Sequence, residues 1–192
     1  IIIDDLGHSW SQAKAVNRGS YRFFEQGMND EVSRRLNLEQ GLREAIQENQ
    51  LELYFQPQVD PAGSLLGLEA LLRWRHPDQG WISPGEFIPV AEKTGLILPI
   101  GEWVLMEACR RLGEWHGRNL DDGLQVAVNV SSIQLQDRGF PALVRRTVQE
   151  AGIPPQRLKL EVTESALLEA TENARDGIDA LREIGIDLSI DD

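Results

Sequence analysis

Polar side chains interrupt several apolar segments of this chain, at positions where apolar periodicity would not place them. Glu69, Asn129 and Glu161 each stand within an otherwise apolar run, and Asp191 and Asp192 follow another. Asn129 and Glu161 lie 32 residues apart, and Glu161 and Asp191 lie 30 apart. One strand–helix unit of an α/β protein has about 30 residues, so equivalent positions on neighbouring strands would converge at one rim. We expect these five side chains to share a site.

The expected site offers only oxygen donors. Carboxylates gathered in one place repel one another unless cations hold them. A donor set without cysteine or histidine favours Mg²⁺, Mn²⁺ or Ca²⁺ over zinc or copper. The adjacent Asp191 and Asp192 could serve two ions, and paired ions about 3.5–4 Å apart act in displacement at phosphorus. The alternative for each residue alone is a solvated or ion-paired carboxylate at a strand end.

The elements that must position these residues begin with a hairpin. Leu51 to Val59 is predicted to be a strand and Leu65 to Arg75 a second strand, antiparallel to the first. Between them, Asp60, Pro61, Ala62 and Gly63 have the composition of a tight turn.

Helices are predicted after the hairpin. Ser83 fits a helix cap, and Glu86 three positions later fits a capping box. Gly95 is expected to close this helix, because glycine is favoured just past a helix end. A further helix is predicted from about Glu102 to Trp115.

Three strand–helix units complete the pattern. The predicted strands are Gln125–Val130, Leu158–Thr163 and Ile186–Ile190, and the helices between them end at Gly152 and Gly185. Strands separated by helices pair in parallel through right-handed crossovers. A (β/α)₈ barrel needs about 250 residues, so we expect only the first part of such a barrel, with its chemistry at the carboxyl ends of the strands.

The beginning of the chain has a different pattern of predicted elements. A short helix around Ala13 is expected to end near Asn17 and Gly19. A longer helix, from about Asp30 and capped by Asn29, is polar on most faces, as a helix that connects two domains would be.

Composition narrows the classes of function. The 192 residues carry a formal net charge of −12, a field that disfavours general nucleic-acid binding. The single cysteine, Cys109, cannot form an internal disulfide, which fits a reducing compartment. The longest apolar stretch, Gly95 to Met106, is broken by Pro99 and Glu102, and is too short to span a membrane. A cytoplasmic segment is expected, whose parent protein could be membrane-anchored elsewhere.

The motifs around these residues carry a family resemblance. Glu69-Ala70-Leu71 resembles the signature of EAL-domain cyclic-di-GMP phosphodiesterases. It stands among further segments in that family's order and spacing: Tyr54-Phe55-Gln56-Pro57, Ser83-Pro84-Gly85-Glu86-Phe87-Ile88-Pro89, Asn129-Val130-Ser131, Glu161-Val162-Thr163-Glu164 and Asp191-Asp192. The resemblance covers about residues 40 to 192 and implies a modified TIM barrel with an antiparallel first strand.

The resemblance assigns a role to each residue of the expected site. It implies that Glu69, Asn129, Glu161 and Asp191 bind a first Mg²⁺ or Mn²⁺ ion, and that Asp192 contributes to a second. Glu69 is thereby also the catalytic residue expected within this chain, while a lysine, a further glutamate and a glutamine of the family would lie beyond Asp192.

Three other residues match the family's substrate and loop positions. Gln56 and Arg73 are implied to contact the dinucleotide, Arg73 through phosphate oxygens, which a planar guanidinium suits. Glu164 is implied to anchor the loop after Asp192, a loop that helps to form the metal site and the dimer interface. Trp81, placed in a glycine-rich loop, is a candidate to touch a guanine, with core or rim packing as the alternative.

The start of the chain resembles the C-terminal tail of a GGDEF (diguanylate cyclase-like) domain. We therefore expect residues 1–28 to be that tail, 29–48 a connecting helix, and 49–192 the incomplete N-terminal portion of an EAL domain. The implied function is metal-dependent hydrolysis of cyclic-di-GMP to linear pGpG in a homodimer. The alternatives are a catalytically silent domain that binds cyclic-di-GMP as a receptor, and a regulatory module.

Overall fold

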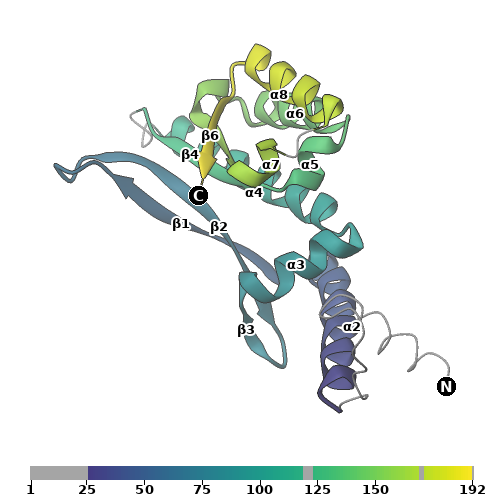
Figure 1. The fold of residues 1–192 in the computed structure, drawn as a ribbon. Coiled ribbons are helices and arrows are strands. Elements are labelled where there is room, and N and C mark those ends of the chain that lie inside the picture. Colours follow the sequence, from purple (N-terminus) through teal and green to yellow (C-terminus); the bar gives the residue numbers. More distant parts are fainter. Residues whose placement is uncertain (1–25, 119–122, 169–170, 192) are drawn as a thin grey trace. The chain divides into compact units, whose positions relative to one another are not determined.

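The fold is built on one mixed β-sheet, which the computed structural model describes within residues 26–118, 123–168 and 171–191 (Figure 1). Its strand order is β1-β2-β4-β5-β6, with β3 beside β2. The strands are β1 (Leu51–Val59), β2 (Leu65–His76), β3 (Gly80–Ile82), β4 (Gln125–Val130), β5 (Leu158–Thr163) and β6 (Asp187–Asp191).

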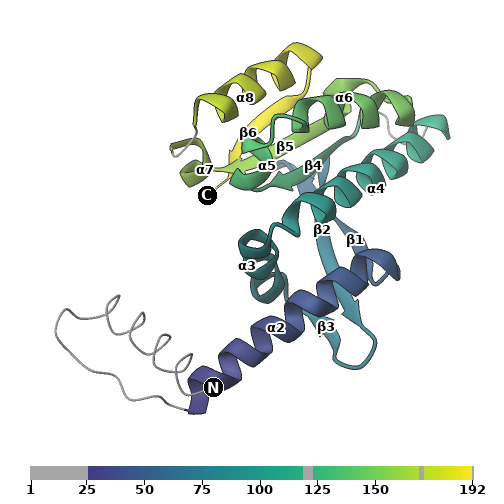
Figure 2. The ribbon, with the colours of Figure 1, turned by 90° about the vertical axis from the view of Figure 1, so that its right-hand side faces the viewer.

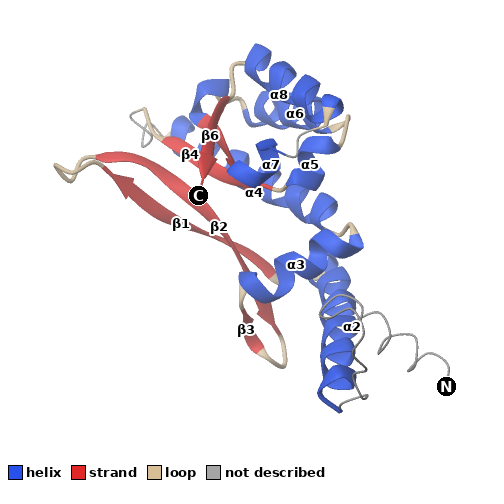
Figure 3. Cartoon of the chain, in the orientation of Figure 1, coloured by secondary structure: helices blue, strands red, loops and turns tan. Residues whose placement is uncertain are grey.

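The first two strands form the predicted antiparallel hairpin, which is longer than the rest of the sheet (Figure 3). Asp60 builds its turn, because Oδ1 accepts hydrogen bonds from the backbone N–H groups of Ala62 and Ser64, both at 2.8 Å. Gly63 completes the reversal at φ 86°, where glycine has no Cβ to oppose the left-handed backbone.

From β2 onward the neighbouring strands β2, β4, β5 and β6 run parallel, as predicted. Helices make the crossovers between them and lie together on one side of the sheet (Figure 2). They are α3 (Pro84–Thr94), α4 (Ile97–Gly117), α5 (Ser132–Gln136), α6 (Phe140–Ala151), α7 (Glu164–Leu168) and α8 (Glu172–Ile184), and a 3₁₀ turn at Pro155–Arg157 precedes β5.

The two faces of the parallel strands differ in polarity. The face under the helices is apolar: Val126, Val128, Leu158 and Leu160 are at most 3% exposed. Side chains on a strand alternate between faces, so Asn129 and Glu161 project from the opposite face. The helix-covered face supplies the hydrophobic core, and the other face carries the polar residues.

Helix ends were predicted better than helix starts. Gly95, Gly152 and Gly185 each follow a helix in the left-handed conformation, as expected. Ser83 occupies the cap position of α3, but its side chain makes no capping hydrogen bond, so the predicted capping box is wrong.

Two helices begin earlier than predicted. Helix α4 starts at Ile97 rather than near Glu102, because Pro99 falls in the first turn, where no backbone N–H is required. Helix α2 spans Gln26–Gln47, so Asn29 lies within the helix and is not its cap.

The chain divides into two compact units, residues 1–40 and 41–192. The second unit holds the whole sheet: a partial TIM-like barrel whose first strand is antiparallel, as predicted. The GGDEF-like tail was predicted for residues 1–28, and its residues 1–25 lie outside the described residues.

Candidate functional site

The candidate site lies on the polar face of the sheet, away from the helices. Residues paired directly across neighbouring strands project from the same face. Asn129 on β4 pairs with Glu161 on β5, and Glu161 pairs with Ser189 on β6. On the other side, Glu69 on β2 pairs with Ala127, two residues before Asn129. A step of two residues keeps the same face, so Glu69, Asn129 and Glu161 share it.

Glu69 and Asn129 are in direct contact. The Asn129 Nδ2 donates a hydrogen bond of 2.8 Å to Glu69 Oε1, although 60 positions separate the two residues in the chain. Gln56 on β1 is the antiparallel partner of Glu69 and joins the same face. The structure thus brings together three of the residues selected from the sequence.

Glu161 is the buried member of the group, only 8% exposed. Its Oε1 accepts a hydrogen bond from Ser189 Oγ at 3.4 Å and forms an ion pair with Lys159 Nζ at 3.2 Å. The hydrogen bond ties β5 to β6 on the polar face. A buried carboxylate requires such partners, because desolvation otherwise disfavours its charged form.

The selected residues follow a slanted line across the sheet. Asp191 pairs with Thr163, two residues beyond Glu161, whereas Glu69 lies two residue levels below Asn129. Two residues advance a strand by about 6.6 Å. The positions therefore lie at different levels of the sheet, although their equal spacing in the sequence suggested a single level. Such a stagger is typical of tilted strands in a barrel. The side chain of Asp191 and all of Asp192 lie outside the description.

Short helices after the strands fix the local geometry. After β4, Ser131 caps α5: its Oγ accepts a hydrogen bond from the Gln134 backbone N–H, and Gln134 Oε1 accepts one from the Ser131 N–H. After β5, the Thr163 side chain accepts a hydrogen bond from Ala166 N–H, and Glu164 begins α7 with its side chain exposed.

Arg73 lies further along β2, four residues beyond Glu69 and on the same face. Its Nη1 donates a hydrogen bond of 2.9 Å to the Leu72 carbonyl, and its guanidinium carbon lies 5.8 Å from the centre of the Tyr54 ring. The Tyr54 ring in turn contacts Trp81 edge to face, with 5.8 Å between centroids. Trp81 belongs to strand β3 and not to a loop, which corrects the prediction.

The donors suit a hard divalent cation. Glu69, Asn129 and Glu161 offer only oxygen ligands of the kind that Mg²⁺ and Mn²⁺ accept. Among the described side chains, which exclude those of Asp191 and Asp192, no three His, Cys, Asp or Glu residues are close enough to hold a metal ion. The donor chemistry therefore fits the ion. The described part of the set is two carboxylates and one carboxamide, and the carboxamide contacts Glu69.

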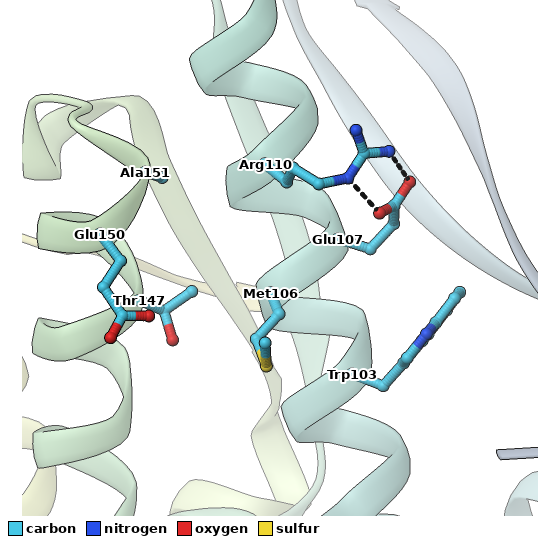
Figure 4. Close-up of a pocket in the computed structure, with 7 residues that line it drawn as sticks. All are labelled: Trp103, Met106, Glu107, Arg110, Thr147, Glu150 and Ala151. Atoms are coloured by element: carbon cyan, nitrogen blue, oxygen red, sulfur yellow. Dashed lines mark hydrogen bonds and ion pairs between the residues drawn. The ribbon is translucent and has the colours of Figure 1, made fainter. Parts of the chain in front are cut away.

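A separate cavity of about 310 Å³ opens between α4 and α6, among the helices (Figure 4). Arg110 lines it but is paired to Glu107 through two contacts of 2.7 Å, which lowers the pKa of the glutamate. None of the residues selected from the sequence lines this cavity.

Comparison with known proteins decides the family. The EAL domain family matches residues 39–192. The chain belongs to the EAL-domain family. The EAL chain is 44% identical over 184 residues to the bifunctional diguanylate cyclase/cyclic di-GMP phosphodiesterase MucR of Pseudomonas aeruginosa, covering 94% of this chain and 26% of MucR. It is 38% identical over 192 residues to the cyclic di-GMP phosphodiesterase NbdA of the same organism, covering 100% of this chain and 24% of NbdA.

Solved structures support the same assignment. The EAL chain superposes on the MucR phosphodiesterase in complex with c-di-GMP with a TM-score of 0.77 and 43% identity. The match covers 81% of this chain and 63% of the MucR chain. The EAL chain thus spans about a quarter of the length of these two curated relatives.

Within the residues that the structure describes, no helix combines the length and apolar character needed to cross a membrane.

Two contributors to the site do not stand out in the sequence. They are Lys159 and Ser189, which contact Glu161 and lie within the predicted strands. Strand alternation was the available signal, since Lys159 stands two positions before Glu161 and must project from the same face. For Ser189 the partner strand had to be known, because only the register places it beside Glu161.

Proposed function

We propose that this EAL domain catalyses the metal-dependent hydrolysis of cyclic-di-GMP to linear pGpG. One observation carries the proposal: Glu69 and Asn129 touch, and Asn129 is the register partner of Glu161, on one polar face. The names of MucR and NbdA, both phosphodiesterases of this dinucleotide, support the choice of substrate.

Each residue has a task within the proposal. Glu69, Asn129, Glu161 and Asp191 would hold one Mg²⁺ or Mn²⁺ ion, and Asp192 would contribute to a second. Bound ions of this kind supply a water of lowered pKa and neutralise charge on the phosphate oxygens. The chain itself orients these ligands, as Asn129 does for the carboxylate of Glu69 and Ser189 for that of Glu161.

Substrate contacts are assigned to β1 and β2. Arg73 would bind a phosphate of the dinucleotide, a pairing that charge-assisted hydrogen bonds favour. The Leu72 carbonyl and the Tyr54 ring restrict where its guanidinium can lie. Gln56, opposite Glu69, would bind the same ligand, and Glu164 would anchor the loop after Asp192.

The partners and setting of the parent protein belong to the same proposal. A GGDEF-like domain in the same chain is supported by MucR, whose name joins cyclase and phosphodiesterase. A homodimer formed through the EAL domain follows from the family resemblance. A cytoplasmic location fits the single cysteine, Cys109, which is buried.

The test is incubation of the protein with cyclic-di-GMP and Mn²⁺ or Mg²⁺, followed by chromatography of the nucleotides. Conversion to pGpG that EDTA abolishes is the expected result. Saturable binding of cyclic-di-GMP without any product would identify the domain as a receptor and overturn the proposal. Absence of both binding and turnover would favour a regulatory module.

A further inference from the structure

A lysine stands directly beside the most buried carboxylate of the site. Lys159 lies two residues before Glu161 on β5, and its Nζ is 3.2 Å from Glu161 Oε1. The two side chains are 28% and 9% exposed, so the pair is partly withdrawn from water. At that depth an ion pair is screened much less than one on the surface.

The charges around Lys159 are mostly negative. Asp187 on β6 is its register partner and projects from the same polar face. Gln125 Nε2 donates a hydrogen bond of 2.6 Å to Asp187 Oδ2, so a neutral amide contacts the carboxylate of Asp187. Glu69 occupies the corresponding level on β2, since both it and Lys159 pair with Ala127. The ammonium group of Lys159 contacts the carboxylate of Glu161, and Asp187 and Glu69 lie at the same level of the sheet on neighbouring strands.

We propose that Lys159 is a positioning residue that serves as the counter-charge of the site when no metal ion is bound. This inference rests on the proposed function, because it concerns affinity for the same Mg²⁺ or Mn²⁺ ion. The lysine fixes the Glu161 carboxylate through Oε1, the oxygen that Ser189 also contacts. It offsets the repulsion among the carboxylates, so that the polar face can form before an ion arrives.

The same contact must weaken metal binding. An ion bound by Glu161 has to share that carboxylate with an ammonium group and is repelled by its positive charge. Lys159 thus stabilises the metal-free protein more than the metal-bound protein. A lysine with a purely structural role would stabilise both forms equally, and this difference makes the proposal testable.

The test compares Lys159→Met with Lys159→Arg and Lys93→Met. Methionine keeps much of the length and volume of lysine without the charge, whereas arginine keeps the charge. Lys93, an exposed residue of α3, controls for the loss of one positive charge elsewhere. Unfolding midpoints are measured with and without saturating Mn²⁺, and Mn²⁺ and Mg²⁺ dissociation constants are measured by calorimetry without nucleotide.

The expected result for Lys159→Met is a lower midpoint without metal and a dissociation constant for Mn²⁺ that is tighter by about threefold or more. Its metal-induced rise in midpoint should exceed that of the wild type, because ligand binding stabilises the folded state according to affinity. Lys159→Arg and Lys93→Met should both resemble the wild type.

Equal metal affinity in Lys159→Met and Lys93→Met would overturn the inference, as would equal destabilisation with and without metal. If Lys159→Met does not fold, Lys159→Gln and the comparison of Lys159→Arg with wild type decide the question. Failure of the wild type to bind either ion would instead contradict the proposed metal-dependent function, so the two failures are distinguishable.

Discussion

Gly101 on α4 is a sensitive point in the packing behind the site. A Cβ at this position would lie 2.0 Å from Nε2 and 2.6 Å from Cδ of Gln134. The Gln134 side chain is buried, at 5% exposure, and its Oε1 accepts hydrogen bonds from the Ser131 N–H and Oγ. In Gly101→Ala, this amide must move and give up the capping box that begins α5.

The cost can be worked from these contacts. Overpacking of a filled interior costs about 1–3 kcal/mol, and loss of a helix cap costs about 0.5–2 kcal/mol, offset by about 1 kcal/mol because alanine favours the helix. We expect a net loss of about 2 kcal/mol in the free energy of unfolding. For a domain of this size the melting midpoint would fall by about 4–8 °C.

The assay is thermal and urea unfolding of Gly101→Ala beside Gly117→Ala. Gly117 ends the same helix, and a Cβ there meets nothing within 4 Å, so Gly117→Ala should be neutral or slightly stabilising. In a Gln134→Ala background, Gly101→Ala should cost at least about 1 kcal/mol less than in the wild type, because the clash is gone. Equal stability of Gly101→Ala and Gly117→Ala would refute the reasoning.

Two further predictions concern single residues. Arg73→Ala should weaken cyclic-di-GMP binding about tenfold or more, since a charge-assisted hydrogen bond contributes about 1.5–3 kcal/mol, while Arg175→Ala on α8 leaves the dissociation constant unchanged. An unaltered constant for Arg73→Ala would remove this residue from the substrate site. Burial raises the pKa of the Cys109 thiol from 9.0 to about 12. The folded protein therefore holds the thiol proton more tightly than the unfolded chain does. This contribution to the free energy of unfolding is fully present below pH 9 and is lost as the pH rises toward 12. The stability advantage of wild type over Cys109→Ala, measured in urea, should therefore shrink between pH 8 and about 10.5, and an advantage that grows would contradict the burial argument.

The β-hairpin and the helix ends were predictable because local chemistry determines them. Asp60 and Gly63 define a turn whatever the strands later contact, and Gly152 ends α6 through its own left-handed backbone. Helix starts were less predictable because capping is optional. Ser83 occupies a cap position without using its side chain, whereas Ser131, which was not predicted as a cap, forms the full capping box.

The shared face of Glu69, Asn129 and Glu161 was predictable from the sequence, whereas their levels on the sheet were not. Glu69, Asn129 and Glu161 were identified because each interrupts an apolar strand, and the sheet does place them on one face. Their stagger depends on strand register, which sequence spacing does not contain. The contacts of Lys159 were not predicted, because an ion pair within a strand requires knowledge of which face is buried.

Metal-dependent hydrolysis at Glu69 is tested most directly by the rate of cyclic-di-GMP linearisation by Glu69→Gln in Mn²⁺. Glutamine keeps the size of Glu69 and an acceptor for the hydrogen bond from Asn129 Nδ2, but it lacks the negative charge that a divalent cation needs. We expect an unchanged unfolding midpoint without metal, with pGpG produced by the wild type and none above background by the variant. A folded Glu69→Gln protein with wild-type turnover would contradict this expectation.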